Sequence, residues 1–270
     1  MKRKAFHYEI EDLTPYIDWS YFFHAWGLGD SSRSGIAMQE TRRDAETMLK
    51  ELNGRYRIHA LFALCDARSE EDNIIIGDTT FPMLRQQHAQ EGKPNLCLSD
   101  FVSPKGSKIG VFATSTDAEF GKMYRDDIYK NLIVQILADR LAEAAATLLH
   151  REVRTDKELW GYAAEERLTI EEMLMEKHQG IRPAVGYPSL PDQSVIFIIN
   201  SLLGLEEIGI GLTPNGAMLP HASVCGLMFS HPAAHYFAVG KISEEQLNDY
   251  AARRGIPANE LRKYLSKNIG

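Results

Sequence analysis

A nine-residue stretch, Gly180 to Pro188, presents a guanidinium group on a stiff loop. The stretch reads Gly-Ile-Arg-Pro-Ala-Val-Gly-Tyr-Pro. Pro183 pushes Arg182 out of the helical region of backbone space, and Gly186 permits a positive φ just before Tyr187. A planar guanidinium group held in this way suits a carboxylate or a phosphate, because two parallel charge-assisted hydrogen bonds need a donor that is already oriented. The alternative is that Arg182 pairs with an internal Asp or Glu across a tight turn.

Other residues could complete a site around this loop. Asp18 lies in the aromatic stretch of residues 16–27, where a low dielectric would strengthen its hold on a cation. The alternative for Asp18 is a solvated or helix-capping carboxylate. Glu143 lies at the edge of an apolar helical stripe, where an acid is unusual unless it has a partner, although a boundary Glu in contact with water is the plainer interpretation. With the aromatic dipeptide Tyr236-Phe237, these residues indicate a pocket for a zwitterionic or aromatic ligand.

Composition excludes several classes of protein. The 270 residues are 44% hydrophobic and 25% charged, which is typical of a globular chain. A formal net charge of −7 argues against a broad electrostatic footprint for nucleic acid. No apolar run approaches the length of a membrane span. The basic start, Met1 to Lys4, is not followed by an apolar segment, so no signal peptide is predicted and the expected location is the cytoplasm.

Neither cysteine nor histidine usage indicates a metal site. The three cysteines, Cys65, Cys97 and Cys225, are far apart and form no C-x-x-C pair, so we expect buried thiols without a disulfide or zinc. His231 and His235 are four residues apart, but Pro232 between them prevents the helical turn that would bring the two rings together. We therefore expect no metal ligand.

Helical patterns frame the candidate residues. Thr14-Pro15 is typical of an N-cap with Pro at the first helical position, which would start a helix before Asp18. Within residues 117–150, the longest predicted helix, an apolar stripe is formed by Ile133, Leu137, Leu141, Ala144 and Leu148. Amphipathic patterns and capping residues predict further helices at 35–52, from the Thr169 capping box to Gly180, from Asp192 to Leu203, from Ser243 to Arg254, and from Pro257.

Strand patterns fall into two clusters. Residues 56–64 and 73–77 predict an antiparallel pair joined by a polar turn at 69–72, and residues 108–113 predict another strand. In the second cluster, residues 222–229 and 236–242 are predicted to form a hairpin-like pair. Strict β-α-β alternation is absent, so we expect an α+β fold in a single domain spanning 1–270, whose N-terminal helical lead covers about 1–54. The sequence lacks G-x-G-x-x-G after a strand, a P-loop, G-x-S-x-G and H-E-x-x-H, so these motifs support no enzyme class.

Several sequence blocks, taken together, resemble the activation domain of cobalamin-dependent methionine synthase. They keep their order from about residue 16 to the C-terminus, and each alone would be weak evidence. The blocks are Ile17-Asp18-Trp19, Leu98-Ser99-Asp100-Phe101-Val102, Leu137 to Glu143, Trp160-Gly161-Tyr162-Ala163, Gly180 to Pro188, Ser223-Val224-Cys225-Gly226, Phe229-Ser230-His231-Pro232 and Tyr236-Phe237-Ala238-Val239.

This resemblance implies a C-shaped module around a twisted, mainly antiparallel sheet that binds S-adenosylmethionine. The family serves repair: when the cobalamin is oxidised to inactive cob(II)alamin, an electron from flavodoxin or a similar donor and a methyl group from S-adenosylmethionine restore methylcobalamin. The implied partner is a corrinoid-carrying methionine synthase chain, which would carry the cobalamin. The implied activity is that of the activation component of a methyltransferase, with no complete activity from this chain alone.

The resemblance also implies ligand contacts. They fall on Asp18, Arg182, Tyr236 and Phe237, with Glu143 and Tyr187 as second contributors. Arg182 would bind the carboxylate of the ligand, Asp18 its ammonium group, and the aromatic rings would border the adenosyl portion and the sulfonium. No side chain is expected to act as a chemical catalyst.

The chain departs from the family pattern in places. Phe237 stands where the family often has a second Tyr, and Leu227-Met228 and Gln193-Ser194-Val195 replace aromatic and charged residues, so the pocket rim and partner surface could differ. The sequence also lacks a D-x-H-x-x-G cobalamin motif, so the module is expected to act on a separate protein. Two functions stay open: a reactivation module acting in trans, and a non-catalytic S-adenosylmethionine-binding adaptor or sensor that caps another corrinoid protein.

Overall fold

A pair of long antiparallel strands forms the centre of the sheet. In the computed structural model, which describes residues 1–28, 35–89 and 91–269, β2 (Ile58–Glu70) pairs with β5 (Ser107–Thr116) from Ile58↔Thr116 to Ala67↔Ser107. Successive side chains of a strand point to opposite faces. Phe62 and Leu64 accordingly join one core cluster, and Leu61 and Ala63 join another on the opposite face. Both faces of the sheet are therefore covered.

The remaining strands extend this pair into a curled, six-stranded antiparallel sheet. The order is β4-β3-β2-β5-β8, and β1 pairs with the first half of β2. The strands are β1 (Lys2–Tyr8), β3 (Asn73–Ile76), β4 (Thr79–Pro82) and β8 (Ser223–Met228), and a separate small hairpin consists of β6 (Gly211–Leu212) and β7 (Met218–Leu219).

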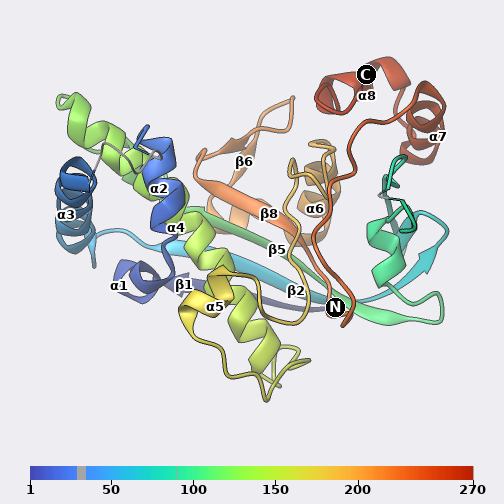
Figure 1. Ribbon diagram of the computed structural model, residues 1–270, viewed down its shortest axis with the longest axis horizontal. Coiled ribbons are helices and arrows are strands. Elements are labelled where there is room, and N and C mark those ends of the chain that lie inside the picture. The colour runs from blue at the N-terminus through green and yellow to red at the C-terminus, as the bar shows by residue number, and fades with distance from the viewer. Residues whose placement is uncertain (29–34, 90, 270) are drawn as a thin grey trace.

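Helices flank the sheet and give the molecule its C shape (Figure 1). One arm contains α1 (Ile10–Leu13), α2 (Trp19–Ala25), α3 (Gly35–Leu52), α4 (Ile128–Thr155) and α5 (Ile170–Leu174). The opposite arm contains α7 (Glu244–Arg254) and α8 (Ala258–Tyr264), and α6 (Val195–Leu203) lies between the arms. Short 3-10 turns occur at Thr14–Tyr16, Leu98–Phe101, Phe120–Lys122 and Leu205–Ile208. The predicted α+β class is confirmed.

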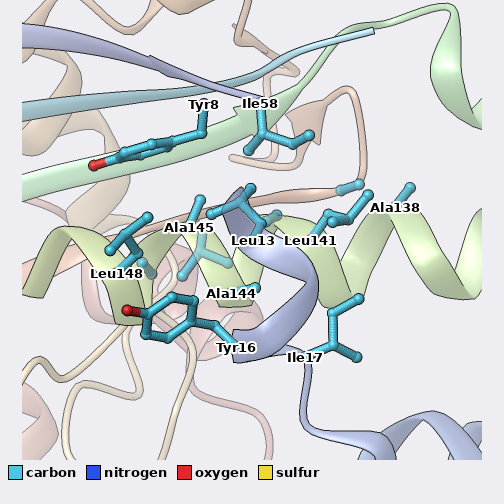
Figure 2. Close-up of a cluster of buried hydrophobic side chains, with 14 of the residues drawn as sticks. Tyr8, Leu13, Tyr16, Ile17, Ile58, Ala138, Leu141, Ala144, Ala145 and Leu148 are labelled. Atoms are coloured by element: carbon cyan, nitrogen blue, oxygen red, sulfur yellow. The ribbon is translucent and has the colours of Figure 1, made fainter. Parts of the chain in front are cut away.

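Helix α4 supplies the apolar ridge on which the first arm is built. Figure 2 shows Leu141 and Leu148 of α4 facing Leu13 and Tyr16, which come from the segment that follows β1. The predicted stripe of Ile133, Leu137, Leu141, Ala144 and Leu148 is buried throughout. Because this ridge lies on one side of α4, another side remains free to present polar groups.

Five details of the sequence prediction are wrong. The N-terminal lead is not purely helical, because residues 2–8 form β1. The helix predicted to start at Pro15 is a single 3-10 turn, and α2 starts after Asp18. The longest helix begins at Ile128 rather than near 117, and the helix opened by Thr169 ends at Leu174. Residues 236–242 form no strand, and β8 pairs with β5 instead.

None of the helices in residues 1–28, 35–89 and 91–269 is long and apolar enough to cross a membrane. The three cysteines are buried free thiols, and burial raises the pKa of Cys97 to about 11 and of Cys225 to about 12.

Candidate functional site

The Arg182 loop is fixed against strand β8 by backbone hydrogen bonds. Ile181 and Phe229 exchange N–H to carbonyl bonds of 3.0 and 2.9 Å, and the Leu227 N–H donates to the Pro183 carbonyl at 3.1 Å. Gly226 makes this approach possible, because a Cβ at that position would lie 2.2 Å from the Pro183 oxygen. The stiff loop predicted from sequence is therefore present, and the sheet holds it in place.

The Arg182 side chain reaches across to helix α4. Its Nη1 donates to Glu143 Oε2 at 3.4 Å, and its Nη2 donates to the Thr147 hydroxyl at 3.0 Å. Tyr187 donates its hydroxyl to the other Glu143 oxygen at 2.8 Å. The Arg182 side chain is 20% exposed, so the guanidinium group is only partly desolvated. Arg182 thus pairs with an internal acid, which was one alternative for this residue. Three of the five N–H groups of its guanidinium group have no partner among the described residues.

The six predicted site residues line one cleft of about 540 Å³. They come from distant parts of the chain and are Asp18, Glu143, Arg182, Tyr187, Tyr236 and Phe237. This volume lies within the usual range for small-molecule sites of roughly 300–1,000 Å³. The structure therefore brings together every residue that the sequence resemblance singled out.

Asp18 both caps helix α2 and lies in the lining of the cleft. Its Oδ1 accepts from the Ser20 backbone N–H at 2.9 Å and from the Ser20 hydroxyl at 2.5 Å. Its Oδ2 has no hydrogen-bond partner in the part of the chain that the structure describes. The capping alternative is therefore correct, and it leaves one carboxylate oxygen for a cation.

An aromatic pair closes another side of the cleft. The Tyr236 hydroxyl accepts the Arg182 backbone N–H at 3.0 Å, and burial raises the pKa of this phenol. The Phe237 backbone N–H donates to the Ser189 hydroxyl at 3.1 Å, and the same hydroxyl donates to the Phe237 carbonyl. Tyr236 is held by its side chain and Phe237 by its main chain, so an irregular segment places two aromatic residues in the lining.

Sequence reasoning did not predict the other polar residues of the lining, and five of them lie on or near helix α4 and the Arg182 loop. They are Thr147, His150, Arg154, Glu176 and His178. The first three follow Glu143 on helix α4 at steps of four, three and four residues, which places them on one helical face. That polar stripe beside an apolar ridge was a signal that could have found them.

Burial favours the neutral form of the two histidines of the cleft. Burial, and then the nearby charge of Arg154, lowers the pKa of His178 to about 4 and that of His150 well below its usual range. His178 Nδ1 lies 3.1 Å from the Gly180 carbonyl, which can only accept, so this nitrogen carries the proton. His150 Nε2 lies 2.9 Å from the Tyr162 hydroxyl, which donates to the Gln179 carbonyl at 3.4 Å.

Charges in the cleft are arranged for a zwitterion. Arg182 is a cation with unused donors, and the carboxylates of Asp18, Glu143 and Glu176 lie in the same lining. Burial raises the pKa of Glu176, and the charge of Arg182 opposes that shift. Among the described residues, no group of three His, Cys, Asp or Glu could hold a metal ion.

Comparison with known proteins identifies the family. The model of the vitamin B12 dependent methionine synthase activation domain matches residues 9–255. The chain belongs to this family. A solved structure described as the MetH reactivation domain bound to AdoHcy (S-adenosylhomocysteine) is similar, with a TM-score of 0.93 and 36% identity, covering 100% of this chain and 91% of that chain. The resemblance seen in the sequence, and the fold that it implied, are confirmed.

Proposed function

We propose that this activation domain binds S-adenosylmethionine in the cleft between α4 and the Arg182 loop. It would serve the reductive methylation of cob(II)alamin on a separate methionine synthase chain. The observation that carries the proposal is the Arg182 guanidinium group. It is held by Glu143 and Thr147 and retains unused donors in a cleft that is also lined by acidic and aromatic residues. The similarity to a reactivation domain bound to S-adenosylhomocysteine supports this ligand.

The cleft suits each part of the proposed ligand. Arg182 offers N–H groups to the amino-acid carboxylate, and Asp18 offers its unpartnered Oδ2 to the ammonium group. Tyr236 and Phe237 would border the adenosyl portion and the sulfonium, because aromatic faces attract cations. Glu143 and Tyr187, already joined by a 2.8 Å hydrogen bond, would be the second contributors.

The role of the protein in the chemistry would be to position the methyl group. The sulfonium already makes methyl a good electrophile, and the partner's cobalamin would supply the reduced metal that receives it. This chain would hold the methyl group in line and exclude water, a proximity effect that accounts for several kcal/mol of barrier. No general base is required from its residues, and an electron donor such as flavodoxin would supply the electron.

Calorimetry with S-adenosylhomocysteine tests the binding step without any turnover. We expect one site per chain, and clearly weaker binding of adenosine, because adenosine lacks the amino-acid end that Arg182 and Asp18 would hold. Equal affinity for the two compounds would contradict the assigned orientation. Absence of binding to both would reject the proposed function.

The alternative function, a binding adaptor or sensor, shares the same cleft. It differs in having no effect on the turnover of a corrinoid enzyme. Adding the chain to an inactivated synthase that lacks its own activation domain separates the two, since only a reactivation module restores activity.

A further inference from the structure

Two histidines from distant parts of the chain meet where strand β1 joins the sheet. The register of β1 and β2 places His7 directly opposite His59, and residues opposite each other in an antiparallel pair project to the same face. Their Nδ1 atoms are 2.7 Å apart, and the rings pack edge to face with centroids 5.0 Å apart. The two residues are separated by 52 positions in sequence, so no motif of short spacing could indicate the pair.

Asp117 determines which nitrogen of His59 is available. Its Oδ1 lies 2.8 Å from His59 Nε2, and its Oδ2 accepts the Arg57 backbone N–H at 2.8 Å. Because an ionised carboxylate can only accept, His59 Nε2 carries the proton. His59 Nδ1 therefore presents a lone pair toward His7. A carboxylate bonded to the far nitrogen of an imidazole is the usual outer partner of a histidine that ligates a metal.

The two Nδ1 atoms are close to the separation that a metal ion requires. An ion bound at 2.0–2.1 Å by two adjacent nitrogens holds them about 2.9–3.4 Å apart. From 2.7 Å, the nitrogens need to move apart by less than about 1 Å. His7 is exposed, so its ring has room to turn, and the His59 side chain is 18% exposed. Water can therefore reach the pair.

We propose that His7 Nδ1 and His59 Nδ1 bind a divalent transition-metal ion such as Ni²⁺, Cu²⁺ or Zn²⁺, with Asp117 as the outer carboxylate. Imidazole suits these ions, whereas Mg²⁺ and Ca²⁺ prefer oxygen ligands. Both rings ligate in the neutral form, so the proton on His7 Nδ1 moves to its Nε2 through solvent. No group of three His, Cys, Asp or Glu among the described residues could hold a metal, so waters complete the coordination shell.

The site is separate from the cleft and from the function proposed above. None of its three residues lines the cleft. The bound ion cross-links β1 to β2, the strand with which β1 pairs. The charge of the ion is offset by Asp117, and the nearby Arg57 guanidinium group is paired with Glu9 at 2.8 Å.

Calorimetric titration with Ni²⁺ tests the site on the full chain without S-adenosylmethionine. We expect Ni²⁺ to bind at one site per chain, and Mg²⁺ at the same concentration to give no signal, since the ligands are nitrogens. Absence of binding at millimolar Ni²⁺ would overturn the proposal.

Matched variants locate the ion. Asp117→Asn keeps both ligands but removes the outer carboxylate, and should weaken Ni²⁺ binding by about 10- to 100-fold. His7→Gln and His59→Gln each remove a ligand, and should weaken it at least as much. His221→Gln removes an exposed histidine that lies 3.6 Å from Asp139, outside this pair, and should keep the full affinity. Unchanged binding in the His7 and His59 variants, or an equal loss in His221→Gln, would mean adventitious surface binding and reject the site.

NMR of the unmodified chain decides the question if a variant does not fold. Substoichiometric Cu²⁺, which is paramagnetic, should broaden the ring signals of His7 and His59 together and before those of His221. Earlier broadening at His221, or broadening of His7 without His59, would contradict a shared ion.

Discussion

Truncation of Arg182 should weaken binding of the ligand through its amino-acid end alone. The Arg182→Ala change removes the guanidinium group but keeps the backbone N–H that donates to the Tyr236 hydroxyl. Charge-assisted hydrogen bonds contribute about 1.5–3 kcal/mol each, and truncation of one partner of a buried charge pair costs about 2–5 kcal/mol. The side chain is 20% exposed and Glu143 already lies 3.4 Å away, so the lower part of that range applies. We expect a loss of about 2–4 kcal/mol, or about 30- to 700-fold in affinity.

A ligand without the carboxylate provides the control. Methylthioadenosine keeps the adenosyl portion and sulfur but lacks the amino-acid end, so its affinity should be the same for the unmodified chain and for Arg182→Ala. Calorimetry with both ligands on both proteins gives the interaction energy between the Arg182 side chain and the amino-acid end of the ligand. If methylthioadenosine loses as much affinity as S-adenosylhomocysteine, Arg182 acts on the shape of the cleft and its guanidinium group does not bind the carboxylate.

Three further changes test the site and its support. Asp18→Asn should lower S-adenosylhomocysteine affinity by about 1–2 kcal/mol in calorimetry and leave the Tm unchanged. Asn is as good an N-cap for helix α2 as Asp, but it carries no charge for the ammonium group. Unchanged affinity would mean that Asp18 acts only as a cap. Gly226→Ala should lower the free energy of unfolding by about 1–3 kcal/mol in urea titrations and displace the Arg182 loop, since its Cβ meets the Pro183 oxygen; a neutral result would contradict the role given to this close approach. The depressed pKa of His178, about 4, means that the unfolded chain binds the additional proton below pH 6.5, so stability should fall as pH drops from 6.5 toward 4. That fall should be shallower in His178→Gln, and equal slopes would show that this group does not titrate on unfolding.

Local signals made much of the fold predictable. Helix α7 begins after Ser243 and ends before Gly255, as predicted. The Ser243 hydroxyl accepts the Gln246 backbone N–H at 3.2 Å. The apolar stripe of α4 was readable because its period is that of a helix. Such elements follow from neighbours in sequence, so sequence alone suffices for them.

The errors arise where distant partners decide the structure. Residues 2–8 form a strand because they pair with β2 from Lys2↔Leu64 to Tyr8↔Ile58, and these partners lie 50 or more residues further along the chain. Residues 236–242 have a strand-like composition but find no free sheet edge, because β8 pairs with β5 on one side and the Arg182 loop lies on the other. Thr169 does cap a helix, yet the chain leaves it after Leu174 to bring Glu176 and His178 to the cleft.

The candidate site was predictable only as far as resemblance and side-chain type allowed. Arg182 could be singled out because Pro183 and the two glycines constrain its loop. The polar stripe of α4 could mark Thr147 and Arg154 as candidates, but which face of α4 the Arg182 loop meets depends on the tertiary fold.

Rescue of turnover tests the central claim most directly. A cobalamin-dependent methionine synthase without its own activation domain is first inactivated to cob(II)alamin and then given this chain, S-adenosylmethionine and a flavodoxin-type electron donor. The account predicts that methionine formation returns and that rescue by Arg182→Ala requires a much higher S-adenosylmethionine concentration. If S-adenosylmethionine binds to the chain but turnover does not return with any corrinoid partner tested, the chain is a binding module, and the proposed reactivation in trans is contradicted.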